Sequence, residues 1–462
     1  MKKQKFRNHG SRSLHPLKKP VAMGLALLLG LTACGSTKYP TQAPTKLTGK
    51  EVLALAAPLE VHQHPEASGE YDEKLAEAYR EFWDRLDKEV QNSRFKDPLY
   101  RYTEKMNRIL LDEGKDNVVY SPLNTYMCLS VLAETAGGKT REEILKALAL
   151  DSPEANRKNG RAMTEIFNYD DGLLHIQSAN AVWMNEAVKT RQEGLEAVNK
   201  DFRASLFQGK MGSSEMDRLL QTWLKENTGG LLDDQANEES LDPSTVFALT
   251  SALYFKGAWN EVFEKAMTKD ETFHGVDGDQ RVPFMHAERG DTIYRGKDFD
   301  ALSLSFGGPA RLWIIRPEDG DFDGLIRSAD LTRLLSNPAD YPDQVSGKVH
   351  MALPKLDLTN KISLVETMRK LGIQEAFDSQ KADFTGLLTP ETPAFLAEAS
   401  HATRFKMDEE GAEAAAYTIM KMEMAMQIPD EIYDFTVDRP FLFVLTAFNE
   451  SPLVVGRVNN LQ

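Results

Sequence analysis

The sequence is poor in cysteine and in positive charge. Its 462 residues contain only two cysteines, Cys34 and Cys128, which excludes a disulfide framework. Fifty-five Lys and Arg residues against 70 Asp and Glu residues give a net charge of −15. This balance argues against nucleic acid or heparin-like polyanions as main partners. The total charge still leaves room for a local basic patch.

The motifs of common enzyme classes are also missing. No GxSxG, HExxH or GxGxxG pattern occurs. AGGKT at 136–140 resembles the end of a phosphate-binding loop, but Ala133 occupies the position of its first glycine. His62 and His64 lie in a stretch that we interpret as a linker, and the other seven histidines have no metal-ligand spacing. These absences favour a protein that is not an enzyme and needs no metal or other cofactor.

The first 33 residues have the layout of a lipoprotein signal peptide. Residues 1–20 are basic, and residues 21–33 are apolar, small and too few to span a bilayer. The run ends in LTAC, which resembles a bacterial lipobox in which Cys34 is lipidated and becomes the new N-terminus. The alternative is an ordinary secretory signal that happens to contain a cysteine. We expect an exported protein, lipid-anchored to the bacterial outer membrane and facing the periplasm or the outside.

The composition divides the rest of the chain into three parts. Residues 34–70 are rich in Pro, Thr, Ala and Gly, which is typical of a flexible tether. Residues 71–94 predict an amphipathic helical extension. Residues 95–462 alternate helix and strand patterns without a linker, which indicates one mixed α+β domain. Within it, the continuous apolar run at 246–255 predicts a strand buried on both faces of a large sheet.

One stretch near the C-terminus combines a helix-forming composition with a strand period. Residues 408–428 are rich in Ala, Glu, Lys and Met, which favour helices, yet their methionines repeat every second residue. In a strand that begins at Gly411, one face carries only small side chains, those of Ala412, Ala414, Ala416 and Thr418. The opposite face carries charge and bulk. The alternative interpretation is an Ala-rich surface helix.

Several longer segments follow one another in a fixed order over residues 97–462. They include NVVYSPLNTYMCLSVLAETAGGKTREEILKAL at 117–148, ALTSALYFKGAWNEVF at 248–263, LPKLDLTNKISLVETMRKLGI at 353–373, DEEGAEAAA at 408–416 and DRPFLFVL at 438–445. Together they resemble the serpins, a family of protease inhibitors. The resemblance implies the serpin fold, an α+β domain with three β-sheets, about nine helices and an exposed reactive-centre loop, here at about 409–430.

The resemblance also implies a mechanism. A target protease attacks a bait bond in the serpin loop and forms an acyl-enzyme. The cut loop then inserts as a strand into the central sheet, and the protease is trapped as a covalent ester. We therefore expect a monomeric, irreversible inhibitor of serine proteases, with papain-like cysteine proteases as further targets. The alternative is a non-inhibitory serpin that acts as a binding protein or a chaperone.

The family pattern assigns the hinge and the bait bond of the loop. The hinge is an unbroken series of acidic and small residues: Glu409, Glu410, Gly411, Ala412, Glu413, Ala414, Ala415 and Ala416. Small inward side chains favour insertion into a packed sheet, so the series favours an inhibitor. The family spacing places the reactive bond between Ala425 and Met426, with Met424 and Gln427 as alternative positions. These small or apolar residues predict targets with elastase-like, subtilisin-like or chymotrypsin-like preference.

The resemblance assigns further residues to the opening of the central sheet. A polar cluster called the shutter comprises Ser121, Asn124, Ser251 and His401, with Ser251 in the place of the usual asparagine. Trp259 matches the tryptophan of the breach, where the loop first enters the sheet. Glu409 resembles a hinge glutamate that pairs with a lysine, and we expect Lys297 to be its partner.

Overall fold

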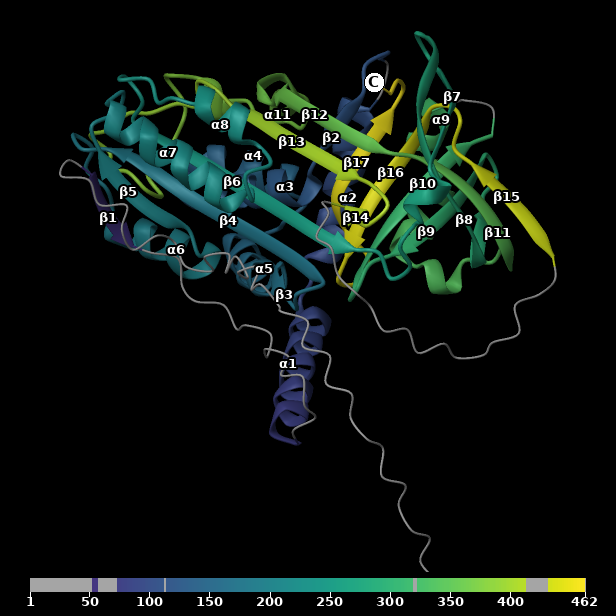
Figure 1. Cartoon of the computed structure of the whole chain (residues 1–462). Helices are drawn as coiled ribbons and strands as arrows, with labels where there is room; N and C mark the ends of the chain where they lie inside the picture. Colours follow the sequence, from purple (N-terminus) through teal and green to yellow (C-terminus); the bar gives the residue numbers. More distant parts are fainter. Residues whose placement is uncertain (1–51, 57–72, 112–113, 319–321, 413–430, 462) are drawn as a thin grey trace, which may run out of the picture. The chain divides into compact units, whose positions relative to one another are not determined.

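The computed structural model describes residues 52–56, 73–111, 114–318, 322–412 and 431–461 (Figure 1). These residues form three β-sheets and eleven α-helices, as expected for the α+β class. The helix count exceeds nine partly because α8, α9 and α11 have only five or six residues. The helices are α1 Glu73–Asn92, α2 Lys96–Leu110, α3 Pro122–Thr135, α4 Gly138–Ala147, α5 Pro153–Ile166, α6 Gln192–Phe202, α7 Ser214–Asn227, α8 Asp233–Glu238, α9 Phe322–Ile326, α10 Ala329–Ser336 and α11 Val365–Lys370.

Sheet A contains eight of the described strands. Its hydrogen-bonded order is β1-β5-β4-β6-β14-β13-β12, and β3 pairs with β4. The strands are β1 Val52–Ala56, β3 Asn168–Asp170, β4 Leu174–Asn185, β5 Ser205–Gly209, β6 Phe247–Ala258, β12 Leu356–Ser363, β13 Ser400–Met407 and β14 Gly411–Ala412. Among the described residues, β6 and β13 share no ladder with each other, and the two-residue strand β14 lies between them.

The other two sheets meet in the long strand β8. Sheet C comprises β15, β11, β8 and β7, and sheet B comprises β8, β9, β10, β16, β17 and β2. Together they form a nine-stranded hydrogen-bonded set. The strands are β2 Val118–Tyr120, β7 Lys269–Gly275, β8 Gly278–Arg295, β9 Phe299–Ser305, β10 Ala310–Pro317, β11 Gln344–Pro354, β15 Ile432–Thr436, β16 Phe441–Ala447 and β17 Ser451–Val458. Strand β16 begins in the DRPFLFVL segment and pairs antiparallel with β17, the last strand of the chain that the structure describes.

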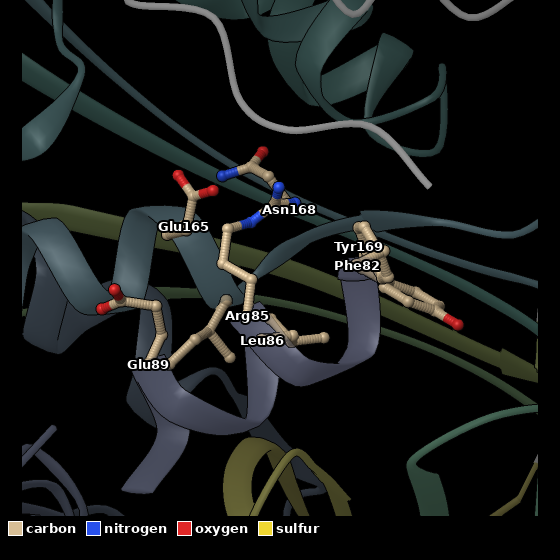
Figure 2. A pocket seen from close by; sticks show the side chains of 8 residues that line it. Phe82, Arg85, Leu86, Glu89, Glu165, Asn168 and Tyr169 are labelled. Atoms are coloured by element: carbon tan, nitrogen blue, oxygen red, sulfur yellow. The ribbon is translucent and has the colours of Figure 1, made fainter. Parts of the chain in front are cut away.

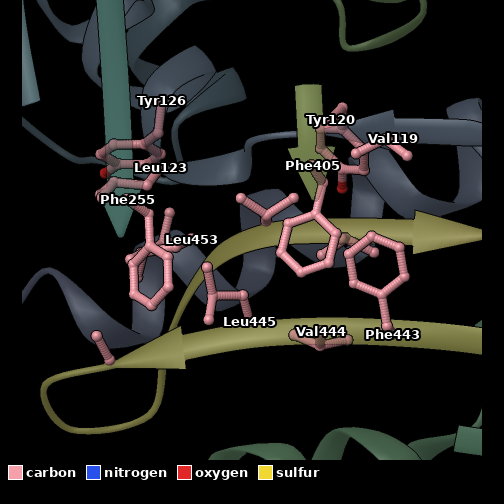
Figure 3. Packing of buried hydrophobic residues seen from close by; sticks show 14 of the residues in the cluster. Val119, Tyr120, Leu123, Tyr126, Phe255, Phe405, Phe443, Val444, Leu445 and Leu453 are labelled. Carbon is pink, nitrogen blue, oxygen red and sulfur yellow. The ribbon is translucent and has the colours of Figure 1, made fainter. Parts of the chain in front are cut away.

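The main hydrophobic core joins sheet A to sheet B and to α3 (Figure 3). Phe405 of β13 stacks on Phe443 of β16 with 4.5 Å between the ring centroids. Leu123 and Tyr126 of α3 belong to the same cluster as Phe255 of β6. Full burial of an apolar side chain of this size contributes about 1.5–3 kcal/mol, so this cluster fixes the position of sheet A over the rest of the domain.

A second cluster fills the space under α7, which crosses β4 and β6 on the other face of sheet A (Figure 1). Trp183 of β4 stacks on Phe207 of β5 at 4.3 Å between centroids. Its edge meets Trp223 of α7 at 6.4 Å, and its indole N–H donates to Thr250 Oγ1 of β6. Sheet A therefore lies between α7 on one face and α3 on the other.

Two parts of the structure differ from the sequence-based expectation. The range 34–70, expected to be a tether, contains β1, which pairs antiparallel with β5 at the edge of sheet A. Strand β6, expected to be buried on both faces, is only half-buried over residues 247–251. Only its β4 edge has a continuous partner among the described residues, and side chains beside an uncovered edge keep part of their surface exposed.

The N-terminal helix α1 packs on the rest of the domain. α1 lies within the range 71–94, and its Phe82 and Leu86 are buried in the main core. None of the helices in the described ranges has both the length and the apolar character that crossing a bilayer requires.

Candidate functional site

The site begins at β14, where two hinge residues already lie within sheet A. Gly411 and Ala412 pair with Ala258 and Gly257 of β6, and Ala412 also pairs with Met407 of β13. A Cβ atom on Gly411 would lie 2.0 Å from the carbonyl oxygen of Gly257. Glycine is therefore required here for close approach to the neighbouring backbone. Ala412 is 2% exposed, so its small side chain points into the packed interior.

The two hinge glutamates hold the chain just before β14. Lys355 Nζ lies 2.8 Å from Glu409 Oε2, and the Thr268 hydroxyl donates to Glu409 Oε1 at 2.8 Å. Burial raises the pKa of Glu409, but hydrogen bonds from Lys355 and Thr268 outweigh it, so the pKa lies below its ordinary value. Glu410 Oε1 lies 2.5 Å from Lys265 Nζ at the surface.

The expected pairing of Glu409 with Lys297 is wrong. Lys355 follows the last residue of β11 and precedes β12, which places its side chain beside the hinge. The backbone N–H of Lys297 instead donates to Asp330 Oδ2, at a different place in the fold. Lys355 lies within the segment LPKLDL, but no sequence pattern connects it to a glutamate more than fifty residues later.

Trp259, which the family pattern assigns to the breach, lies directly against the hinge. Its indole N–H donates to the Asp408 carbonyl at 2.9 Å, and its backbone N–H donates to the Glu410 carbonyl at 3.0 Å. The ring is 1% exposed and stacks on Phe306 with 4.3 Å between centroids. One rigid aromatic residue thus fixes the backbone on both sides of Glu409.

A second polar group, formed by the residues assigned to the shutter, surrounds the buried His401. β13 alternates inward and outward residues, which places His401 and Thr403 on the same inward face. The Ser121 backbone N–H donates to His401 Nε2 at 2.9 Å, and the Thr403 hydroxyl lies 2.7 Å from the same nitrogen. An acceptor nitrogen carries no proton, so the imidazole is neutral. Burial lowers the pKa of His401 from 6.5 to about 4.

Ser121 connects His401 to α3 and to sheet B. It is the N-cap of α3, with Pro122 at the first helical position, and its Oγ accepts from the Asn124 N–H at 3.0 Å. The same hydroxyl donates to the Leu453 carbonyl of β17 at 2.6 Å. Both hydrogen-bonding roles of this hydroxyl are therefore used, and the start of α3 is fixed between two sheets.

Ser251 completes the group from β6. Its hydroxyl donates to the Asn124 carbonyl at 3.5 Å, a long contact compared with the usual 2.5–3.0 Å of O–H donors. The four residues assigned to the shutter are therefore neighbours in space, connected from β13 through α3 to β6. The contact on the β6 side is the weakest of these links, in agreement with the shorter reach of serine at this position.

Sequence reasoning did not identify Thr403, Thr268 or Lys265 as parts of these two groups. Thr403 had a signal, because it follows His401 by two residues in a strand period. Thr268 and Lys265 reach the hinge from the segment after β6, and only tertiary structure brings them there. In the part of the chain with described coordinates, no three His, Cys, Asp or Glu side chains converge as metal ligands.

The remaining assigned residues lie outside the described ranges. They are the later hinge residues, the two bait positions with their alternatives, and the proposed lipidation site: Glu413, Ala414, Ala415, Ala416, Met424, Ala425, Met426, Gln427 and Cys34.

Comparison with known proteins identifies the family. The model of the serpin family, serine protease inhibitors, matches residues 91–461. The chain belongs to the serpin family. It is 29% identical over 355 residues to alpha-1-antiproteinase 2 of Equus caballus, covering 74% of this chain and 81% of that protein. It is 28% identical over 349 residues to serpin-Z1C of Triticum aestivum, covering 71% and 86%.

Solved serpin structures share the fold. The thermophilic serpin tengpin in its native state matches with a TM-score of 0.70 at 22% identity, covering 87% of this chain and 98% of tengpin. Human thyroxine-binding globulin complexed with thyroxine matches with a TM-score of 0.67 at 21% identity, covering 79% of this chain and 98% of that protein. These likenesses show that the chain has the serpin fold.

Proposed function

We propose that this serpin irreversibly inhibits serine endopeptidases by inserting its cleaved loop between β6 and β13. As a family, serpins are protease inhibitors. The trapping mechanism is supported by the position of β14, which lies between β6 and β13. Its buried Ala412 pairs with both strands where insertion of the loop would begin. Beyond β14, the facing edges of β6 and β13 carry backbone N–H and C=O groups with which an inserted strand would form hydrogen bonds.

The register of β14 supports a specific position for the inserted strand. Ala412 pairs with Gly257 of β6 and with Met407 of β13, both antiparallel. Each further residue of an inserted strand would therefore pair with the preceding residue of each neighbour. In the proposed inserted strand, Thr418 comes six residues after Ala412 and would therefore lie opposite both Ser251 and His401. Alternation puts Thr418 on the same inward face as Ala412. The insertion mechanism therefore places a small hydroxyl beside the shutter rather than an apolar side chain.

The bait residues define the proposed targets. Ala425 before the cut bond suits the small pocket of elastase-like enzymes, and the neighbouring methionines suit subtilisin-like or chymotrypsin-like enzymes. Papain-like cysteine proteases, which also form acyl-enzymes, are secondary targets in this proposal. The inhibitor acts as a monomer, because one loop and one sheet of the same chain complete the trap.

The N-terminal sequence supports a place of action. We propose that Cys34 carries lipid and anchors the protein to the bacterial outer membrane. Metabolic labelling with a fatty acid, followed by mass analysis, tests this directly. Incorporation that disappears in Cys34→Ser supports the anchor, and a secreted, unlabelled protein contradicts it.

The experiment for the inhibitory function is a denaturing gel after incubation with an elastase-like serine protease. A band at the summed mass of the two proteins supports covalent trapping. A released C-terminal peptide beginning at Met426 places the cut bond at Ala425, and one beginning at Ala425 or Gln427 moves it to an alternative. Cleavage without a stable complex across elastase-like, subtilisin-like and chymotrypsin-like enzymes contradicts the proposal and favours a non-inhibitory serpin.

A further inference from the structure

A hollow of about 510 Å³ lies between the N-terminal helix α1 and the helices α5 and α6. Its volume is within the range of small-molecule sites. α1 contributes Arg85 and Glu89, which precede the family match at residues 91–461. The hollow is therefore completed by the extension of this chain and does not belong to the matched domain alone.

Positive charge dominates the lining of the hollow. Five cationic side chains face two carboxylates, those of Glu89 and Glu165. The cations are Arg85 of α1, Lys158 and Arg161 of α5, Lys200 of α6 and Arg203 just after α6. The chain as a whole carries a net charge of −15. This hollow thus reverses the average charge of the molecule, and its contributors are too scattered in the sequence to form a basic motif.

Only part of this charge is neutralised within the protein. Arg203 pairs with Glu165, and Arg161 Nη1 lies 2.5 Å from Asp201 Oδ1. Lys158 and Lys200 are exposed and form no ion pair within the described part of the chain. Burial lowers the pKa of Arg203, because part of the hydration of its guanidinium is lost. A bound anion would replace that hydration.

Arg85 gives α1 a direct role in the hollow. Its guanidinium lies 5.4 Å from the ring centroid of Phe82, and Figure 2 shows the side chain reaching from α1 toward Glu165 and Asn168. Beneath it, α1 and α5 pack closely and leave a cavity of only about 10 Å³. The arginine is therefore held at the boundary between α1 and α5 by a well-packed contact.

We propose that this hollow binds a small phosphorylated ligand, either a free phosphate ester or the headgroup of a lipid. Two lysines supply point charges and the arginines supply planar forks, the combination that suits phosphate oxygens. A long sulfated chain fits less well. The exposed face of α1 carries the carboxylates of Glu77, Glu81, Asp84 and Asp87, which repel a polyanion that extends beyond the hollow.

Calorimetric titration of the full-length protein with inorganic pyrophosphate at low ionic strength tests the site. We expect one-site binding that weakens about tenfold or more in the double variant Lys158→Gln/Lys200→Gln. The control Lys105→Gln/Lys210→Gln removes the same charge from two exposed lysines elsewhere. We expect it to bind like the unchanged protein, and we expect Arg85→Gln to weaken binding as well.

Vesicle sedimentation separates the two sources of phosphate. Binding to vesicles of phosphatidylcholine with phosphatidylglycerol, but not of phosphatidylcholine alone, identifies a headgroup when it is lost in Lys158→Gln/Lys200→Gln. Pyrophosphate binding without vesicle binding identifies a free ester. The proposal is overturned if pyrophosphate does not bind, if both double variants bind equally, or if only a long heparin-like chain binds. Formation of the protease complex by each variant provides a check of folding that is independent of this site.

Discussion

Strands β6 and β16 are both long and central, yet they differ in their pairing and burial. β16 pairs along its length with β10 on one side and β17 on the other, and all its residues are buried. Of the strands that the structure describes, only β4 pairs with β6 along its length, while β14 meets it over two residues, and the first part of β6 is half-buried. Within the described ranges, β16 thus has partners on both sides, whereas one edge of β6 has no continuous partner, and the proposed insertion would add a strand at that edge.

The largest effect is expected where β14 enters sheet A. Ala412→Arg places a long cation at a position that is 2% exposed, and burying an unpaired charge is strongly unfavourable. We expect insertion to fail, so that the protease cleaves the variant and the covalent complex disappears. Gel quantification of complex against cleaved inhibitor measures this. Ala412→Ser is the control of similar size, and a complex yield of Ala412→Arg equal to that control would contradict the account.

A change in β16 is expected to affect stability without changing the trap. Leu445 is fully buried, and Leu→Ala changes in cores typically cost about 2–5 kcal/mol. Because sheet B is complete before and after insertion, Leu445→Ala should lower the free energy of unfolding of intact and cleaved protein alike. Denaturant unfolding of both forms measures the two losses. A loss confined to one form would show that sheet B also changes during insertion.

Acid should weaken the group around His401. The pKa of His401 is lowered to about 4 in the folded state, so the unfolded state binds more protons between about pH 6.5 and pH 4. The contribution of the neutral histidine is present above pH 6.5 and is lost as the pH falls toward 4. The expected decrease in the free energy of unfolding is about 3 kcal/mol. His401→Gln should flatten the pH profile of the Tm, and an unchanged profile would refute this assignment.

The smallest effects are expected at the hinge ion pairs, and they differ from each other. Lys355→Ala leaves the Glu409 carboxylate, whose side chain is 6% exposed, without its cation, and a buried group that loses its partner typically costs about 1–3 kcal/mol. Lys265→Ala removes a side chain that is 69% exposed, and exposed pairs contribute little. Thermal unfolding should therefore rank Lys355→Ala well below Lys265→Ala. Equal Tm values would mean that the Glu409 pair does not hold the hinge.

The sequence predicted those features that depend on local pattern. Strand alternation predicted that Ala412 faces inward. The family resemblance assigned four residues to one cluster: Ser121, Asn124, Ser251 and His401. The sequence did not predict the long-range ion pair between Glu409 and Lys355, because no local pattern connects two residues that meet only in the folded protein. The sequence also did not predict that β6 is half-buried, since an apolar run does not show whether both edges of a strand have continuous partners.

The N-terminal region shows the same limit. The amphipathic pattern predicted α1, because the helical period of apolar residues is visible within the segment itself. The pairing of β1 with β5 was missed, since VLALA at 52–56 is a short apolar run whose partner strand lies far away in the sequence. The basic hollow beside α1 was missed for another reason. Arg85, Lys158 and Lys200 are far apart in the sequence and meet only after three helices pack.

The most direct test of the central claim is the Tm of the protein before and after cleavage of its loop by an elastase-like protease. If the cut loop becomes a strand between β6 and β13, both strands gain a new set of backbone hydrogen bonds, and the Tm should rise on cleavage. The rise should be absent in cleaved Ala412→Arg. A Tm that stays unchanged or falls in the cleaved wild-type protein would contradict insertion, because a merely nicked surface loop adds no strand to sheet A.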